Sequence, residues 1–312
     1  MGGLFLGIPT YLLFWQANGF FALFSARILQ GAMFGMASIT ALSFISIRSP
    51  AERRGRNMGF YNTLSASGKS FGALAGGYLV GEFGFGAPYG AIVGLYGLSL
   101  LLVYKWVPAE RREEREETGL DLQRLAGRAN FQIQMFFEMT FALAKSTIIV
   151  FVPVYAYAVL GLSEFQLGIV VAARYLPMVL VQGFAGKLSD RVGRAPLVVT
   201  GGVIFLVSPF LLPTQSTLLG LSAISLLFGL GDSIRVPASW AVFADEGVDS
   251  GPATSFSFRM LAWRPGILIG PVLGGLIKDL TNIAHTFHFG GFFVFVALVI
   301  YLLMQVKKGK WD

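Results

Sequence analysis

Charged side chains inside long apolar segments are the residues of this sequence best placed to do chemistry. A charge at the centre of a membrane helix costs about 2.5–3.5 kcal/mol on insertion scales, so it usually faces a cavity or an oppositely charged partner. Such groups can bind an ionic solute or exchange a proton. The apolar runs of this chain contain two carboxylates and six cations of this kind: Glu138, Asp232, Arg27, Lys69, Lys145, Arg174, Arg235 and Arg264.

The excess of cations in this set favours a negatively charged solute. Uncompensated positive charge in a low-dielectric cavity is unfavourable unless an anion or a carboxylate offsets it. We therefore predict a small organic anion as the substrate. The alternative is that acidic partners lie on helices absent from this sequence. The residues expected to contact the substrate are Lys69, Lys145, Arg174 and Arg264.

If the movement of this solute is coupled to protons, a group in the protein must change its protonation state. Buried carboxylates respond to desolvation and to nearby cations, so Glu138 and Asp232 are the candidates. Arg235 lies three residues from Asp232, on the same helical face, and an intrahelical ion pair is expected there. Glu138 is therefore the first candidate. It is seven residues from Lys145, too far for a direct bond but suited to lining one cavity. Purely structural pairing of these groups remains an open alternative.

The composition indicates that membrane helices hold these charges. Of the 312 residues, 54% are hydrophobic and only 13% are charged, whereas soluble domains carry about 25% charged residues. The net charge of +7 could suggest nucleic acid, but the basic residues do not gather on a soluble face. We predict an all-α membrane protein and no nucleic-acid partner. A membrane helix needs about 20 predominantly apolar residues, and the ten candidates are 2–16, 20–47, 57–81, 88–107, 131–159, 164–185, 195–212, 216–244, 254–279 and 286–306.

Basic residues are concentrated on alternate connections between these segments. Sixteen of the 24 lysines and arginines lie on one such side, at 48–56, 105–128, 187–194 and 307–310. The positive-inside rule assigns that side to the cytoplasm. Both chain termini are then cytoplasmic, and a plasma or inner membrane is the expected location.

A glycine pattern occurs twice in the sequence, at a constant separation of 198 residues. Small residues four apart in apolar helices allow close backbone packing, and two copies in register indicate a duplicated helical unit. The first copy comprises Gly68, Gly72, Gly76 and Gly77, and the second comprises Gly266, Gly270, Gly274 and Gly275.

Residues 186–196, GKLSDRVGRAP, resemble the cytoplasmic loop signature of the major facilitator superfamily of transporters. Residues 27–31, RILQG, resemble the R-x-x-Q-G motif of that family's fourth helix. The resemblance implies a major facilitator superfamily-like helical bundle of about ten transmembrane helices, which correspond to the family's helices 3–12. Subtracting the repeat separation places the first loop signature before Met1, so the first two family helices are expected to be missing. The implied parts are a four-helix partial bundle (1–107), a cytoplasmic linker (108–130) and a six-helix bundle (131–312).

The resemblance also implies a function, namely secondary active transport by alternating access and driven by protons or another ion. Arg27 matches a position linked to proton transfer in drug/proton antiporters, which makes multidrug efflux an alternative. That subgroup has proline where this chain has Ala73, although Pro271 is present in the second copy. A truncated, transport-inactive protein is a third possibility. The residues expected to form the cytoplasmic gate are Gly186, Asp190, Arg191, Gly193 and Arg194.

Several other activities lack sequence support. There is no nucleophile elbow, P-loop or pair of catalytic carboxylates, so we expect no enzyme activity and no cofactor. His285 and His288 share a helical face, but no third ligand lies nearby, and no metal site is predicted. The expected partners are a small-molecule substrate, a proton or other coupling ion, and the lipid bilayer. The protein is expected to be a monomer.

Overall fold

The computed structural model describes residues 2–48, 51–107, 129–246 and 252–308. Every regular element in these ranges is a helix. The predicted linker falls mostly on residues 108–128, outside the described residues. The elements are α1 (Gly2–Gln16), α2 (Phe20–Arg48), α3 (Ala51–Phe83), α4 (Gly86–Trp106), α6 (Ala129–Ala158), α7 (Glu164–Leu180), α8 (Gln182–Val192), α9 (Arg194–Leu211), the 3-10 turn η1 (Leu212–Thr214), α10 (Leu218–Glu246), α11 (Pro252–Leu280) and α12 (Ile283–Lys308).

Each of the ten predicted segments corresponds to one helix or, for 164–185, to the bent pair α7–α8. By length and hydropathy, seven described helices could cross a membrane, or eight if the bent pair is one span. The remaining two are α1, which has only 15 residues, and α3, which carries polar side chains such as Lys69. The all-α membrane fold is confirmed.

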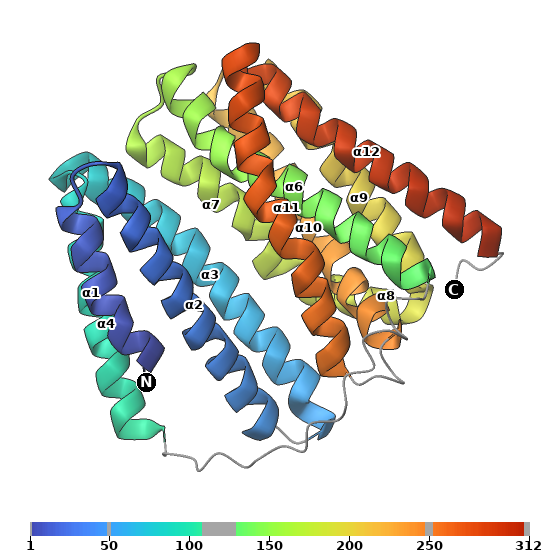
Figure 1. The fold of residues 1–312 in the computed structure, drawn as a ribbon, viewed down its shortest axis with the longest axis horizontal. Helices are drawn as coiled ribbons and strands as arrows, with labels where there is room; N and C mark the ends of the chain where they lie inside the picture. Colours follow the sequence, from blue (N-terminus) through green and yellow to red (C-terminus); the bar gives the residue numbers. More distant parts are fainter. Residues whose placement is uncertain (1, 49–50, 108–128, 247–251, 309–312) are drawn as a thin grey trace.

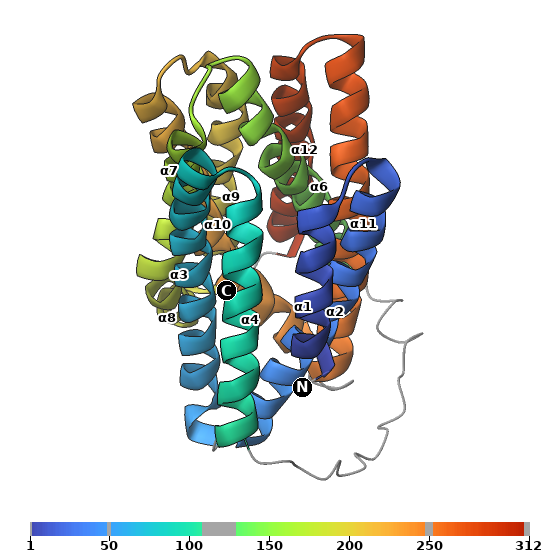
Figure 2. The same ribbon diagram turned by 90° about the vertical axis from the view of Figure 1, so that its left-hand side faces the viewer.

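Helices α1 to α4 lie on one side of the molecule and α6 to α12 on the other (Figure 1). In the first group α1 packs against α2 and α4, and in the second α6 packs against α11 while α9 packs against α10. Helix α3 packs most extensively against α7 (Figures 1 and 2). Contact between the two groups therefore depends mainly on α3 and α7.

Small residues bring α3 and α7 close together. A Cβ atom on Gly77 would lie 2.5 Å from the Glu164 carbonyl oxygen, and one on Gly168 would lie 2.6 Å from the Ala73 carbonyl oxygen. The Ser70 hydroxyl donates a hydrogen bond to the Ala172 carbonyl over 3.3 Å. We call the five small residues among them, Ser70, Ala73, Gly77, Gly168 and Ala172, the α3–α7 seam. The absence of large side chains there lets the two backbones approach.

The two glycine repeats have different surroundings. On α11, a Cβ atom on Gly266 or Gly270 would overlap the backbone of α6, and one on Gly274 would lie 2.7 Å from the Phe151 ring. The predicted close packing is thus confirmed for the second copy. On α3, added Cβ atoms at Gly68, Gly72 and Gly76 would meet nothing within 4 Å. In the first copy only Gly77 makes a close contact.

The segment with the loop signature is mostly helical. Residues 182–192 form α8, which bends by 45° from α7 at a break after Leu180. Gly186, one of the expected gate residues, lies within this helix and not at a turn. The turn occurs at Gly193, whose φ of 94° is a left-handed conformation that favours glycine. Helix α9 begins directly afterwards.

Candidate functional site

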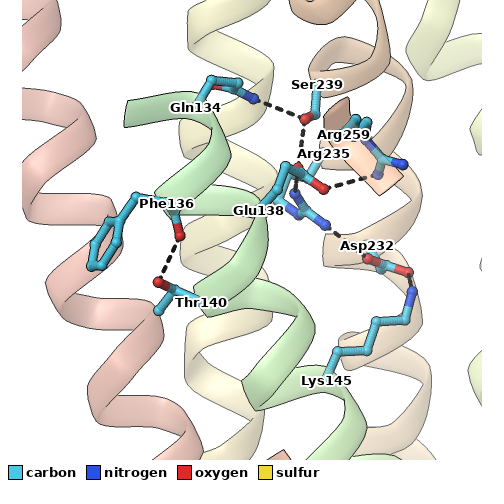
Figure 3. Close-up of polar contacts among 9 residues, drawn as sticks. All are labelled: Gln134, Phe136, Glu138, Thr140, Lys145, Asp232, Arg235, Ser239 and Arg259. Atoms are coloured by element: carbon cyan, nitrogen blue, oxygen red, sulfur yellow. Dashed lines mark hydrogen bonds and ion pairs between the residues drawn. The ribbon is translucent and has the colours of Figure 1, made fainter. Parts of the chain in front are cut away.

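A fully buried carboxylate and two arginines meet where α6, α10 and α11 pack together (Figure 3). Arg235 Nη1 donates to Glu138 Oε1 over 2.6 Å, and Arg259 Nη2 donates to Glu138 Oε2 over 2.9 Å. Each carboxylate oxygen of Glu138 therefore accepts from a different guanidinium. Charge-assisted hydrogen bonds of this kind are stronger than neutral ones.

Two polar side chains complete the surroundings of Glu138. The Ser239 hydroxyl donates to Glu138 Oε1 over 2.6 Å, and Gln134 Nε2 donates to Ser239 Oγ over 3.0 Å. Gln134 is 3% exposed and Ser239 is 0% exposed. The negative charge of Glu138 is thus satisfied by several donors, as a buried charge requires.

A second carboxylate, Asp232, lies beside the first. Lys145 Nζ donates to Asp232 Oδ2, and the two form an ion pair between α6 and α10. Arg235 Nη2 lies 3.5 Å from Asp232 Oδ1. The predicted intrahelical pair between Asp232 and Arg235 is therefore present, but it is long, since Arg235 turns towards Glu138. Glu138 and Lys145 are predicted to line one cavity. In the structure each pairs instead with residues of opposite charge, Glu138 with Arg235 and Arg259, and Lys145 with Asp232.

Aromatic rings flank the cations of this network. The Arg235 guanidinium lies 4.2 Å from the Phe141 ring centroid, and the Arg259 guanidinium lies 4.1 Å from that of Trp240. Lys145 Nζ lies 5.5 Å from the Trp263 ring. Cation–π contacts of this geometry contribute about 0.5–2 kcal/mol each. They compensate part of the desolvation of the guanidinium groups.

The network carries one more positive than negative charge. Its members are Glu138, Asp232, Lys145, Arg235 and Arg259, which we call the charge cluster. Lys145 is the only member with appreciable exposure, at 20% of its side chain, while Arg235 is 0% and Arg259 is 3% exposed. Any ionic partner from outside would therefore reach the cluster first at Lys145.

The four residues predicted to contact substrate do not form a single site. Lys145 is paired with Asp232. Arg264 is exposed on α11 and has no ion-pair or hydrogen-bond partner among the described residues. Lys69 and Arg174 converge on Tyr175, at 5.9 Å and 4.5 Å from its ring centroid, and Arg174 also donates to the Tyr175 hydroxyl over 2.6 Å. Two cations from the two sides of the α3–α7 contact thus flank one tyrosine.

A small cavity lies next to Arg174, among α6, α7 and α10. Its volume is about 20 Å³, enough for a water-sized group, and besides Arg174 its walls are almost entirely apolar. The other lining residues are Ile148, Ile149, Val152, Pro153, Val170, Val171, Leu212, Ser225 and Phe228.

The remaining predicted residues lie away from the charge cluster. Arg27 donates to Gln30 over 2.9 Å and lies 5.3 Å from the Phe14 ring, so it contacts the glutamine of its own sequence motif. Asp190 and Arg194, two of the expected gate residues, form an ion pair across the turn at Gly193. In the described part of the chain, no three His, Cys, Asp or Glu side chains gather as metal ligands.

Sequence reasoning missed Arg259, the second cation on Glu138. Arg259 lies close to the start of its predicted segment, 254–279, and was not counted among the charges inside the membrane. A tryptophan four residues later, Trp263, lies on the same helical face and contacts it at 5.3 Å. This i, i+4 pairing of arginine and tryptophan was the available signal.

An apolar helical bundle with buried ion pairs between its helices defines a multi-pass membrane protein of a transporter-like fold. The sequence pattern of the Major Facilitator Superfamily matches residues 1–133 and 134–312. The chain therefore belongs to the Major Facilitator Superfamily.

Known proteins similar to this chain include transporters of that family. An uncharacterized MFS-type transporter of Methanocaldococcus jannaschii is 25% identical, over 97% of this chain and 80% of its own length. The quinolone resistance protein NorA of Staphylococcus aureus is 26% identical, over 48% of this chain and 39% of its own length. The crystal structure of the fucose:proton symporter FucP of E. coli superposes with a TM-score of 0.63 over 97% of this chain and 82% of that one, at 16% identity. The last comparison supports the fold alone.

Proposed function

We propose that this protein moves a small organic anion across the membrane by proton-coupled alternating access. The observation that carries the proposal is the charge cluster, which has an excess cation and whose exposed member is Lys145. Lys69 and Arg174, which flank Tyr175 without a carboxylate partner among the described residues, support it further. An anion is the solute that such a distribution of charge favours.

Alternating access would rock the two groups of helices about the α3–α7 seam, with the solute held between them near the middle of the membrane. The pairing of Asp190 with Arg194 would help to close the cytoplasmic side, together with Gly186, Arg191 and Gly193. We place the protein in a plasma or inner membrane as a monomer with both termini in the cytoplasm.

A binding screen tests the anion proposal. The purified full chain is heated in detergent with matched pairs of solutes, such as benzoate and benzylamine, which differ mainly in the sign of their charge. We expect carboxylates to raise the unfolding temperature, because ligand binding stabilises the folded state. A rise with cationic solutes alone would contradict the proposal. Arg174→Gln should abolish the rise in unfolding temperature that benzoate causes, whereas Arg264→Gln should retain more of that rise.

Drug/proton antiport is a second candidate. The similarity to NorA and the contact between Arg27 and Gln30 of the R-x-x-Q-G motif favour it. In that case lipophilic cations rather than carboxylates would bind, and Arg27→Gln would abolish their exchange for protons. A chain without transport activity would bind neither class.

A further inference from the structure

The two buried carboxylates differ in how tightly their counterions are fixed. Glu138 is held by Arg235 and Arg259, and arginine keeps its charge under all physiological conditions. Both guanidinium groups are buried and stacked on aromatic rings. Glu138 therefore has counterions that neither lose their charge nor move readily.

Asp232 depends instead on Lys145. The charged groups around Asp232 are Lys145 and Glu138 of α6, Arg235 of its own helix α10 and, farther away, Arg259 of α11. Only Lys145 makes a close ion pair with it, because Arg235 is 3.5 Å away and is already engaged by Glu138. Within the described residues, helices α7, α8 and α9 supply no charged side chain in contact with Asp232. Its compensation thus depends on the most exposed member of the charge cluster.

Lys145 also lies on the face of α6 that borders the cavity. Ile148, Ile149 and Val152 line that cavity and lie three, four and seven residues beyond Lys145, on the same helical face. The first two are one helical turn away, or about 5 Å along the axis. A carboxylate group that reached Arg174 at this cavity would therefore lie close to the long Lys145 side chain.

We propose that the solute anion and Asp232 compete for Lys145, and that anion binding makes Asp232 take up a proton. This inference rests on the proposed function, from which it takes the anionic solute. When Lys145 Nζ turns to the anion, its bond to Asp232 Oδ2 breaks and a proton from water binds that carboxylate oxygen, since a buried carboxylate without its counterion is unfavourable. Anion and proton then bind together and are carried in the same direction, so the protein is a symporter rather than an antiporter.

The first experiment needs no solute. In the full chain in detergent, Lys145→Gln removes the competing cation, so infrared spectroscopy near neutral pH should detect a protonated carboxylic acid that the unmodified protein lacks. The signal should disappear in Lys145→Gln/Asp232→Asn. Lys145→Arg keeps the ion pair, and Lys69→Gln changes a lysine in contact with no described carboxylate, so neither should produce it. Absence of the signal in Lys145→Gln, or its persistence in Lys145→Gln/Asp232→Asn, overturns the inference.

The second experiment uses benzoate as the probe and benzylamine as its cationic counterpart. Adding benzoate to the unmodified protein in weakly buffered solution should cause proton uptake, and by linkage its affinity should fall about 5- to 150-fold as the pH is raised. Asp232→Asn should abolish both effects. Binding of benzoate with proton release or with no proton change overturns the inference but leaves the anion proposal intact. If no carboxylate binds, the proposed function fails, and the infrared result still decides whether Lys145 controls Asp232.

Discussion

At the scale of single residues, the account depends on which buried charges share a partner. Glu138 pairs with two arginines of different helices, whereas Asp232 is compensated mainly by Lys145. The sequence identified four of these five charges but paired them within helices or along one helix, because spacing in the sequence reports only local neighbours. The tertiary contacts between α6, α10 and α11 could not be obtained from spacing. No feature of the sequence made Asp232 a better candidate for proton exchange than Glu138.

Removing the Glu138 charge should destabilise the fold strongly. Glu138→Gln leaves Arg259 buried without a counterion and Arg235 with only its 3.5 Å contact to Asp232, and breaking a buried ion pair in this way costs about 3–5 kcal/mol. Denaturant unfolding in detergent measures the loss. Asp232→Asn should cost less, since the freed Lys145 is already 20% exposed and can turn towards water. The matched control is Asp190→Asn, whose pair with Arg194 is exposed, and equal stability of Glu138→Gln and this control would contradict the assignment.

At the scale of helices, the lengths of the apolar runs predicted every described helix except α8 and the short turn η1, including the helices on both sides of the predicted linker. The bend between α7 and α8 was not predicted, because the apolar run continues through it. The glycine repeat predicted close packing for both copies, yet only the second copy meets a neighbouring helix. A repeat in sequence therefore indicates equivalent helices but does not show which of their faces are covered.

Equivalent alanine substitutions in the two repeats should have opposite effects. In Gly266→Ala the new Cβ would meet the backbone of α6, and overpacking of this kind costs about 1–3 kcal/mol. In Gly68→Ala, at the matching position of α3, the Cβ would meet nothing within 4 Å, and replacing a helical glycine gains about 0.5–1 kcal/mol. Unfolding temperatures of the two variants provide the comparison. Equal destabilisation by both would show that the α3 glycines are packed after all.

At the scale of the whole molecule, the α3–α7 seam joins the two groups of helices, and the charge cluster lies entirely within the second group. The division of the chain at 107 and 131 remains a prediction. A transporter that rocks about this seam would keep its coupling charges on one side and carry solute along the contact, where Lys69 of α3 and Arg174 of α7 flank Tyr175.

Cross-linking tests the seam directly, because the chain contains no cysteine. Ser70→Cys and Ala172→Cys, introduced together with a protease site between residues 108 and 128, should form a disulfide on oxidation. After cleavage the two fragments should stay joined on a non-reducing gel and separate on a reducing one. Gly72→Cys with Ala172→Cys is the matched control, since Gly72 has no neighbour within 4 Å. Equally efficient cross-linking of the control pair would place α7 on a different face of α3.

The central claim is that an organic anion and a proton move together through this protein. The most direct measurement is the internal pH of proteoliposomes that contain the full chain, after an inward gradient of benzoate or another carboxylate found to bind is imposed. We predict that the interior becomes acidic with the unmodified protein and that Asp232→Asn abolishes this change. Entry of the carboxylate without acidification, or an interior that becomes alkaline as the solute enters, would contradict the account.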